Sequence, residues 1–171
     1  MSGARKLLIA SGLALALWGM GYGLYYAVFI EHQTLDRLGS SLAGGFALAA
    51  GRDLPGARAA LGDFAAASYV YVRQVDAHGH WIGLSMLLIL FGAVFHLVSF
   101  SDRVKFWLSV GLVSGTIAFP LGVLLETANR GWGPKLVAIL GSAILTLTLL
   151  CVAVGFAIAR PEGRHVERGR S

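Results

Sequence analysis

The chain has 171 residues, of which 56% are hydrophobic and 13% are charged, and its mean hydropathy is +0.70. Soluble domains carry about 25% charged residues, so this composition excludes an ordinary soluble domain and is typical of an integral membrane protein. The formal net charge is +5. The single cysteine, Cys151, excludes an intrachain disulfide and any Cys-x-x-Cys redox or zinc motif.

Four apolar runs are each long enough to cross a membrane as a helix. The first, residues 7–30, exceeds the ~20 residues that about 30 Å of hydrocarbon requires, and it is longer than the apolar core of a signal peptide. The others are 81–100, 106–125 and 135–159. We therefore predict an all-α fold, an integral membrane four-helix bundle that forms one domain over residues 1–171.

The long connection between the first two runs, residues 31–77, is too polar to span a membrane but keeps helical periodicity. Leucines recur at helical spacing up to Gly51, which predicts that one helix ends there. Asp53 can cap a second helix with Pro55 in its first turn. This helix can run straight into the second membrane run, with Gly79 as a weak point. We expect two amphipathic helices packed on the outer surface of the bundle.

Small residues are aligned on the first and third membrane runs. Gly19 and Gly23, like Gly111 and Gly115, are four residues apart and therefore lie on one face of a helix. Such strips permit close helix contact, either within the chain or with neighbouring subunits. The partners that we expect are the lipid bilayer and, as an alternative, other membrane subunits.

Cationic residues are distributed unequally between the two sides of the predicted bundle. The N-terminus, the turn at 101–105 and the tail at 160–171 together hold eight Lys or Arg and three acidic residues, whereas the two opposite loops hold six of each. The positive-inside rule then places both termini in the cytoplasm of a bacterial-type inner membrane, with residues 31–77 on the periplasmic side. The basic tail is expected to be attracted to anionic lipid, so the charge does not indicate nucleic-acid binding.

Titratable residues gather where the loops enter the membrane on the side opposite the termini. His32 follows the first membrane run, Asp76, His78 and His80 open the second, and Glu126 ends the third. Ionisable groups at a membrane helix are costly, so they are often functional. In an up-down-up-down bundle these positions lie at similar depth, which predicts a ligand site. The alternative is that the lipid headgroups simply solvate these side chains.

The spacing of these residues limits how they can act together. Asp76 and His80 are four residues apart and share a helix face, where a carboxylate can fix the tautomer of a metal-bound or haem-bound imidazole. His78 and His80 are about 200° apart on a regular helix. They can bind one ion only if the helix breaks at Gly79, and otherwise each serves a different partner.

The Asp-Ala-His-Gly-His-Trp sequence at 76–81 opens a membrane helix and resembles the H-x-H segment of subunit I of the haem–copper oxidases and its small relatives. The resemblance covers Asp76–Gly92, and the other ligand-bearing helices of that family have no counterpart here. It implies that His78 and His80 are haem or metal ligands that point to different centres. It does not imply oxygen reduction or proton pumping.

Two kinds of cofactor fit this set of side chains. Haem b suits an apolar bundle and a bis-imidazole pair such as His32 with His80. Copper or zinc suits His78 and His80 converging through a broken turn, with His32, Asp76 or Glu126 completing the shell. Either would make the protein an electron-transfer or metal-handling accessory. The alternative is a non-catalytic structural subunit of a larger redox or photosynthetic membrane complex, and no nucleophile or acid–base pair indicates an enzyme.

His96 lies apart from this predicted site. It is roughly 24 Å beyond His80 along a helix, near the opposite membrane surface, and neither neighbouring run offers a second histidine at that depth. We therefore expect His96 to be a buried, hydrogen-bonded residue and not a haem ligand. Cys151 is at a similar depth and could approach it.

Overall fold

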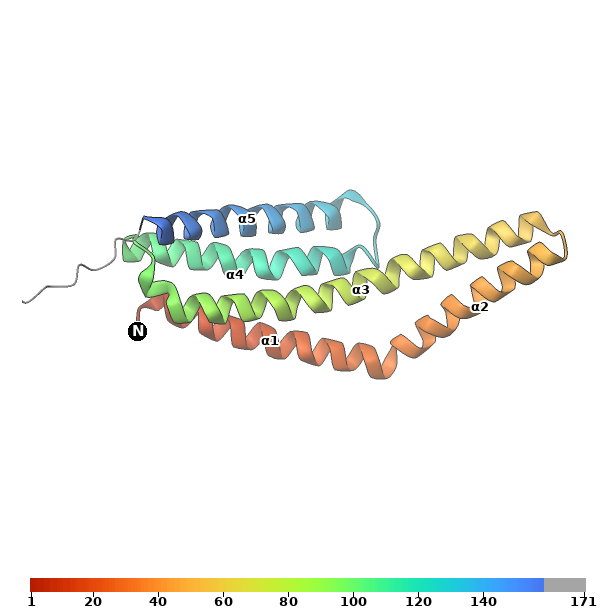
Figure 1. Cartoon of the computed structure of the whole chain (residues 1–171), viewed down its shortest axis with the longest axis horizontal. Helices are drawn as coiled ribbons and strands as arrows, with labels where there is room; N and C mark the ends of the chain where they lie inside the picture. The colour runs from red at the N-terminus through yellow and green to blue at the C-terminus, as the bar shows by residue number, and fades with distance from the viewer. Residues whose placement is uncertain (159–171) are drawn as a thin grey trace, which may run out of the picture.

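The computed structural model describes residues 1–158, and all of the regular secondary structure in this part of the chain is helical. Its helices are α1 (Gly3–Phe29), α2 (Glu31–Ala50), α3 (Leu54–Val94), η1 (Phe95–Leu97), α4 (Asp102–Leu125) and α5 (Trp132–Ala157) (Figure 1). α1, α3, α4 and α5 are each long and apolar enough to cross a membrane. The predicted all-α fold with four membrane-length helices is confirmed. The basic tail at 160–171 lies outside the described residues.

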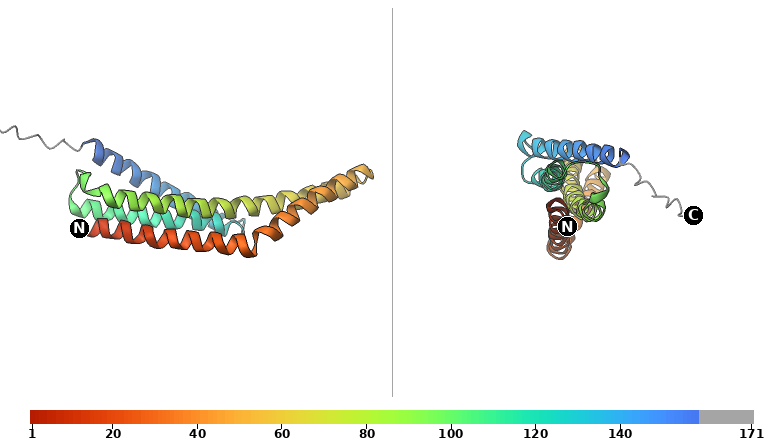
Figure 2. Two further views of the ribbon diagram at one scale, coloured as in Figure 1. Left: turned by 60° about the horizontal axis from the view of Figure 1, so that its bottom comes forward. Right: turned by 90° about the vertical axis from the view of Figure 1, so that its left-hand side faces the viewer.

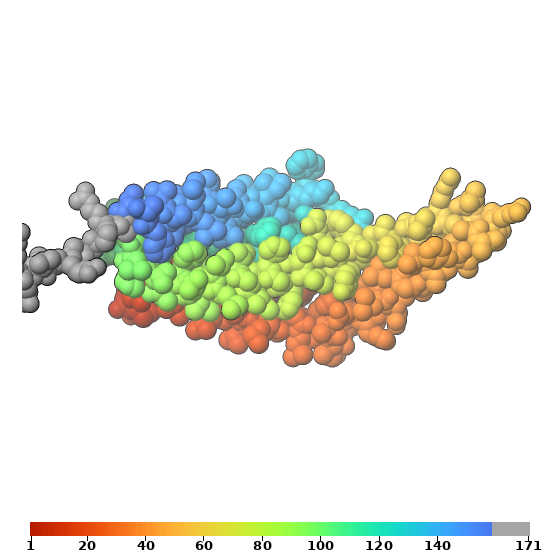
Figure 3. Space-filling view, viewed as in Figure 1, coloured from red at the N-terminus to blue at the C-terminus, as the bar shows by residue number. Residues whose placement is uncertain are grey.

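Four helices lie side by side, and a helical pair projects beyond one end of them (Figures 1 and 2). This pair, which we call the hairpin, is α2 together with residues 54–76 of α3. The N-terminus and the last turn of α5 both lie at the opposite end of the bundle, which we call the termini end. The space-filling view shows the hairpin standing clear of the bundle (Figure 3). The expectation that helices 31–77 pack on the bundle surface is therefore wrong.

The hairpin projects because α3 is one continuous helix of 41 residues. It passes through Gly79 without a break, although a helical glycine costs about 1 kcal/mol relative to alanine. The residues on either side of that glycine hold the helix in place, since Ala77 and Trp81 are both buried. A chain that stays helical here keeps the direction of the bundle helix, and this carries it away from the bundle.

The turn between α2 and α3 follows the local signals in the sequence. α2 ends at Ala50 with Gly51 as its C-cap, and Pro55 lies in the first turn of α3. The Asp53 carboxylate accepts a hydrogen bond from the backbone N–H of Gly56 at 3.0 Å. Arg52, which lies between Gly51 and Asp53, has a left-handed backbone, with φ of 62°. The predicted end of one helix and the predicted cap of the next are confirmed.

Both glycine strips bring helices of the same chain together. A Cβ at Gly19 would lie 3.1 Å from the side chain of Ile82, so this strip faces α3. A Cβ at Gly115 would lie 3.0 Å from the Gly141 carbonyl oxygen, so the second strip faces α5. These positions are therefore occupied within the chain and are closed to neighbouring subunits.

At the termini end, α3 stops six residues before the predicted limit of its apolar run. The 3-10 turn η1 turns Phe95 into the core, and Val98 follows it. His96 between them is exposed, and its carbonyl oxygen lies 3.4 Å from the Lys105 ammonium. The expectation of a buried His96 is therefore wrong, because the tighter turn gives the core positions to its apolar neighbours.

The N-terminus is attached to this same end of α3. The Arg5 guanidinium donates to the carbonyl oxygens of Gly92 at 3.0 Å and Ala93 at 3.2 Å. The last carbonyls of a helix have no partner within the helix, so a cation there satisfies them and opposes the negative end of the helix dipole. α1 and α3 are thus joined at the termini end by a polar contact as well as by packing.

Candidate functional site

His78 points from α3 toward α1 and is half-buried. Its Nδ1 lies 3.0 Å from the carbonyl oxygen of Gly19. The ring fills the space beside Gly23, where an added Cβ would overlap it. When Nδ1 carries the proton it donates to that carbonyl, so His78 joins α1 to α3 at the hairpin end of the bundle.

His80 lies on a different side of the same helix, facing α4. Its ring meets the Phe119 ring edge-on, with 4.7 Å between centroids and an interplanar angle of 77°. Its Nδ1 lies 2.6 Å from the backbone carbonyl oxygen of Asp76. The predicted pairing of residues 76 and 80 is present, but the backbone oxygen is the partner and not the carboxylate. An Nδ1–H donated there leaves Nε2 as the ring nitrogen able to bind a ligand.

His32 lies in the first turn of α2 and does not meet the other histidines. Its Nε2 lies 3.4 Å from the Asp36 carboxylate, and both side chains are largely exposed. An exposed ion pair one helical turn apart contributes at most a few tenths of a kcal/mol. His32 therefore behaves as a surface residue of the hairpin.

The structure does not gather the five predicted residues into one site. Within residues 1–158, no three His, Cys, Asp or Glu side chains lie close enough to share a metal ion. Because α3 is unbroken at Gly79, His78 and His80 keep their helical separation and face α1 and α4 respectively. Any cofactor bound through one of them needs ligands from elsewhere.

Glu126 belongs to a polar cluster that sequence reasoning missed. It follows α4, is only 6% exposed, and accepts a hydrogen bond on Oε2 from the Tyr69 hydroxyl at 2.6 Å. The Arg73 Nε lies 3.3 Å from the same oxygen. The guanidinium of Arg130, in the α4–α5 loop, covers the Tyr69 ring at 4.5 Å. We call Tyr69, Arg73, Glu126 and Arg130 the Glu126 cluster.

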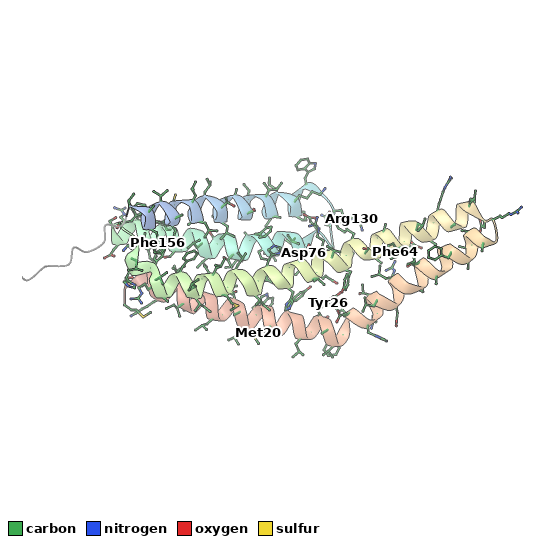
Figure 4. The ribbon with its side chains drawn as sticks, in the orientation of Figure 1. Met20, Tyr26, Phe64, Asp76, Arg130 and Phe156 are labelled. Atoms are coloured by element: carbon green, nitrogen blue, oxygen red, sulfur yellow. The ribbon has the colours of Figure 1, made fainter. Side chains whose placement is uncertain are left out.

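The Glu126 cluster lies where the hairpin leaves the bundle, at the level of the labelled Asp76 and Arg130 in Figure 4. It ties the hairpin half of α3 to the end of α4 and to the α4–α5 loop. Tyr69 and Arg73 are four residues apart, so a search for polar residues on the helix face of Asp76 and His80 would have found them. Their partner on another helix is not visible in the sequence.

No protein-family model matches this chain, and neither does any curated protein or solved structure. The resemblance of Asp76–Gly92 to the haem–copper oxidase segment therefore stays a prediction. What the geometry offers is a braced hairpin and two separate imidazoles, each hydrogen-bonded to a backbone carbonyl.

Proposed function

We propose that the protein is a non-catalytic subunit of a larger membrane complex and that the hairpin binds an apolar helical surface of a neighbouring subunit. The observation that carries this proposal is the exposure of large apolar side chains on a helical pair outside the bundle. Phe46 is 68% exposed and Leu61 is 53% exposed, and Leu35 and Leu54 are exposed as well. Soluble surfaces rarely leave such side chains uncovered together.

The hairpin also lacks a core of its own. Its buried residues are the small ones Gly45, Ala57 and Ala67. Helices in proteins are stabilised mainly by burying an apolar face, and a pair that buries only glycine and alanine leaves that stabilisation incomplete. A further helical surface laid along the hairpin would supply it, while the Glu126 cluster holds the hairpin in a fixed direction.

Orientation in the membrane is part of this proposal. The distribution of cations supports cytoplasmic termini in a bacterial-type inner membrane and a periplasmic hairpin. Single cysteines at Ser2 and Ala59, in a Cys151→Ala background, test it in intact cells. Labelling by an impermeant maleimide is expected at position 59 and not at position 2, and the reverse pattern would overturn the topology.

Gentle extraction tests the complex itself. Native electrophoresis is expected to show the protein in an assembly larger than the monomer. Phe46→Asn and Leu61→Asn should release it, whereas Arg58→Gln, an exposed change on the same hairpin, should not. A discrete monomer under the same extraction contradicts the subunit proposal.

A second candidate function rests on His80. Its Nδ1 contact with the Asp76 carbonyl leaves Nε2 directed away from its own helix, which is the arrangement of a metal-bound imidazole. We propose that His80, with a ligand from a neighbouring subunit, holds haem b, copper or zinc in an electron-transfer or metal-handling complex. His32, His78 and Glu126 each have other contacts in this chain.

Absorption spectra and metal analysis of the intact assembly test this candidate. A Soret band, or stoichiometric copper or zinc, should be lost in His80→Ala and kept in His32→Ala. Assembly prepared without chelator that shows neither haem nor metal excludes it. That result leaves the subunit proposal standing, because the hairpin argument does not depend on a cofactor.

A further inference from the structure

A cavity of about 390 Å³ lies at the base of the hairpin, between the first turns of α2 and residues 66–70 of α3. Its polar lining consists of Gln33, Thr34 and Arg37 from α2 and Arg130 from the α4–α5 loop, and the rest of the lining is small or aliphatic. Two of its side chains are cations and none is an acid. The cavity therefore concentrates positive charge in a recess of a hairpin whose charges are otherwise mixed.

Neither arginine of the cavity forms an ion pair in the described part of the chain. Arg130 contacts the face of the Tyr69 ring, which fixes its position and leaves its N–H donors unused by that contact. Glu126, the buried acid of the Glu126 cluster, is already bound by Tyr69 and Arg73. The two guanidinium groups are thus available to an anion from outside the chain.

The donors in the cavity suit a tetrahedral oxyanion. A guanidinium presents a planar fork of N–H groups that binds phosphate oxygens in pairs. The Thr34 hydroxyl already donates to the Ile30 carbonyl at 3.0 Å, so the Gln33 amide is the further donor. A phosphate held by Arg37 and Arg130 would have charge-assisted hydrogen bonds from two different elements.

The position of the cavity indicates where such a phosphate could come from. Ile30, the residue between α1 and α2, lines it, and α1 is one of the four membrane-length helices. The end of a membrane helix lies at the level of the lipid headgroups. The cavity can therefore receive a phospholipid headgroup from the bilayer or a phosphoryl compound from the aqueous side.

We propose that this cavity is a phosphate-binding site in which Arg37 and Arg130 are the principal ligands. A bound phosphate bridges α2 to the α4–α5 loop. Among the residues that the structure describes, α2 buries only Gly45, so this bridge would add an attachment to the packing of α2 against α3. The site is independent of the proposed assembly and of any cofactor at His80.

The test uses the full chain purified in a neutral maltoside detergent and stripped of lipid. Two probes are compared, phosphatidylglycerol added to the micelles and inorganic phosphate at constant ionic strength. Native mass spectrometry counts bound lipid, and thermal unfolding measures protection by either probe. Arg37→Gln and Arg130→Gln are each expected to weaken binding about ten-fold, which is the loss of one charge-assisted hydrogen-bonding partner.

Arg58→Gln is the matched control, because it removes the same charge from an exposed position of the hairpin outside the cavity. It should bind like the wild type, and Arg130→Lys, which keeps the charge and loses the fork, should be intermediate. Circular dichroism confirms that each variant is folded. Binding of phosphatidylglycerol alone identifies the ligand as a headgroup, and protection by inorganic phosphate identifies a soluble phosphoryl compound. Absence of binding by both probes, or equal loss in Arg58→Gln, overturns the proposal.

Discussion

The Glu126 cluster should contribute a measurable part of the stability of the protein. Glu126→Ala removes the acceptor of the Tyr69 hydroxyl and the counter-charge of Arg73 at a buried position. Hydrogen bonds to charged groups contribute about 1.5–3 kcal/mol each. The Arg73 side chain is 35% exposed, so solvent screens its share and places it at the low end. We expect Glu126→Ala to lower the free energy of unfolding by about 2–4 kcal/mol.

Thermal unfolding in detergent, followed by circular dichroism, measures this loss. For a chain of this size, 1 kcal/mol corresponds to roughly 2–4 °C, so the midpoint should fall by roughly 5–15 °C. Glu126→Gln keeps an acceptor for Tyr69 and should lose about half as much. Asp63→Asn, an exposed change on α3, the helix that carries Tyr69 and Arg73, should stay within about 0.5 kcal/mol of the wild type.

A double-mutant cycle separates the hydrogen bond from general damage. Tyr69→Phe combined with Glu126→Gln should show a coupling energy of about 0.5–3 kcal/mol, as expected for groups in direct contact. If the two changes are additive, or if Glu126→Ala melts with the wild type, the cluster does not brace the hairpin and the reasoning fails.

Three further changes test the packing of the bundle and the cap of α3. Gly23→Ala should cost about 1–3 kcal/mol, because the new methyl group overlaps His78, and a thermal melt detects it. Gly122→Val should be more damaging, because even a Cβ there meets the Ala138 backbone. Loss of the monodisperse peak in size-exclusion chromatography would show this damage. A normal peak and a normal melt would contradict the close contact of α4 and α5. Asp53→Ala removes an N-cap and should cost about 1 kcal/mol locally, seen as faster hydrogen exchange in the first turn of α3 and unchanged exchange in α5.

The parts of the fold that were predictable depend on local sequence. Long apolar runs specify membrane-length helices, and Gly51 and Asp53 specify a turn because each acts on its own backbone or the next few residues. The direction of the hairpin was not predictable. It depends on whether α3 breaks at Gly79, and this is decided by the burial of Ala77 and Trp81 against other helices.

In the candidate site, too, local relations were predictable from the sequence and contacts between helices were not. The sequence placed His80 beside Asp76, because residues four apart on a helix must be neighbours, but the partner is the backbone carbonyl oxygen of Asp76 and not its carboxylate. The sequence grouped Glu126 with the histidines, whereas its partner in the structure is the Tyr69 hydroxyl, which is 57 residues away in the chain. Such a contact depends on how two helices are rotated toward each other, which no local pattern encodes.

The unbroken α3 joins the tip of the hairpin to the termini end of the bundle as one continuous element. Its 41 residues span about 60 Å, so a change of about 5° in its tilt would move the ends of the helix by several ångströms relative to each other. One arm carries the turn at Gly51, and the other ends at the carbonyls that Arg5 holds. A displacement of the hairpin tip would therefore reach the termini end of the bundle through a single helix, with no break in the backbone on the way.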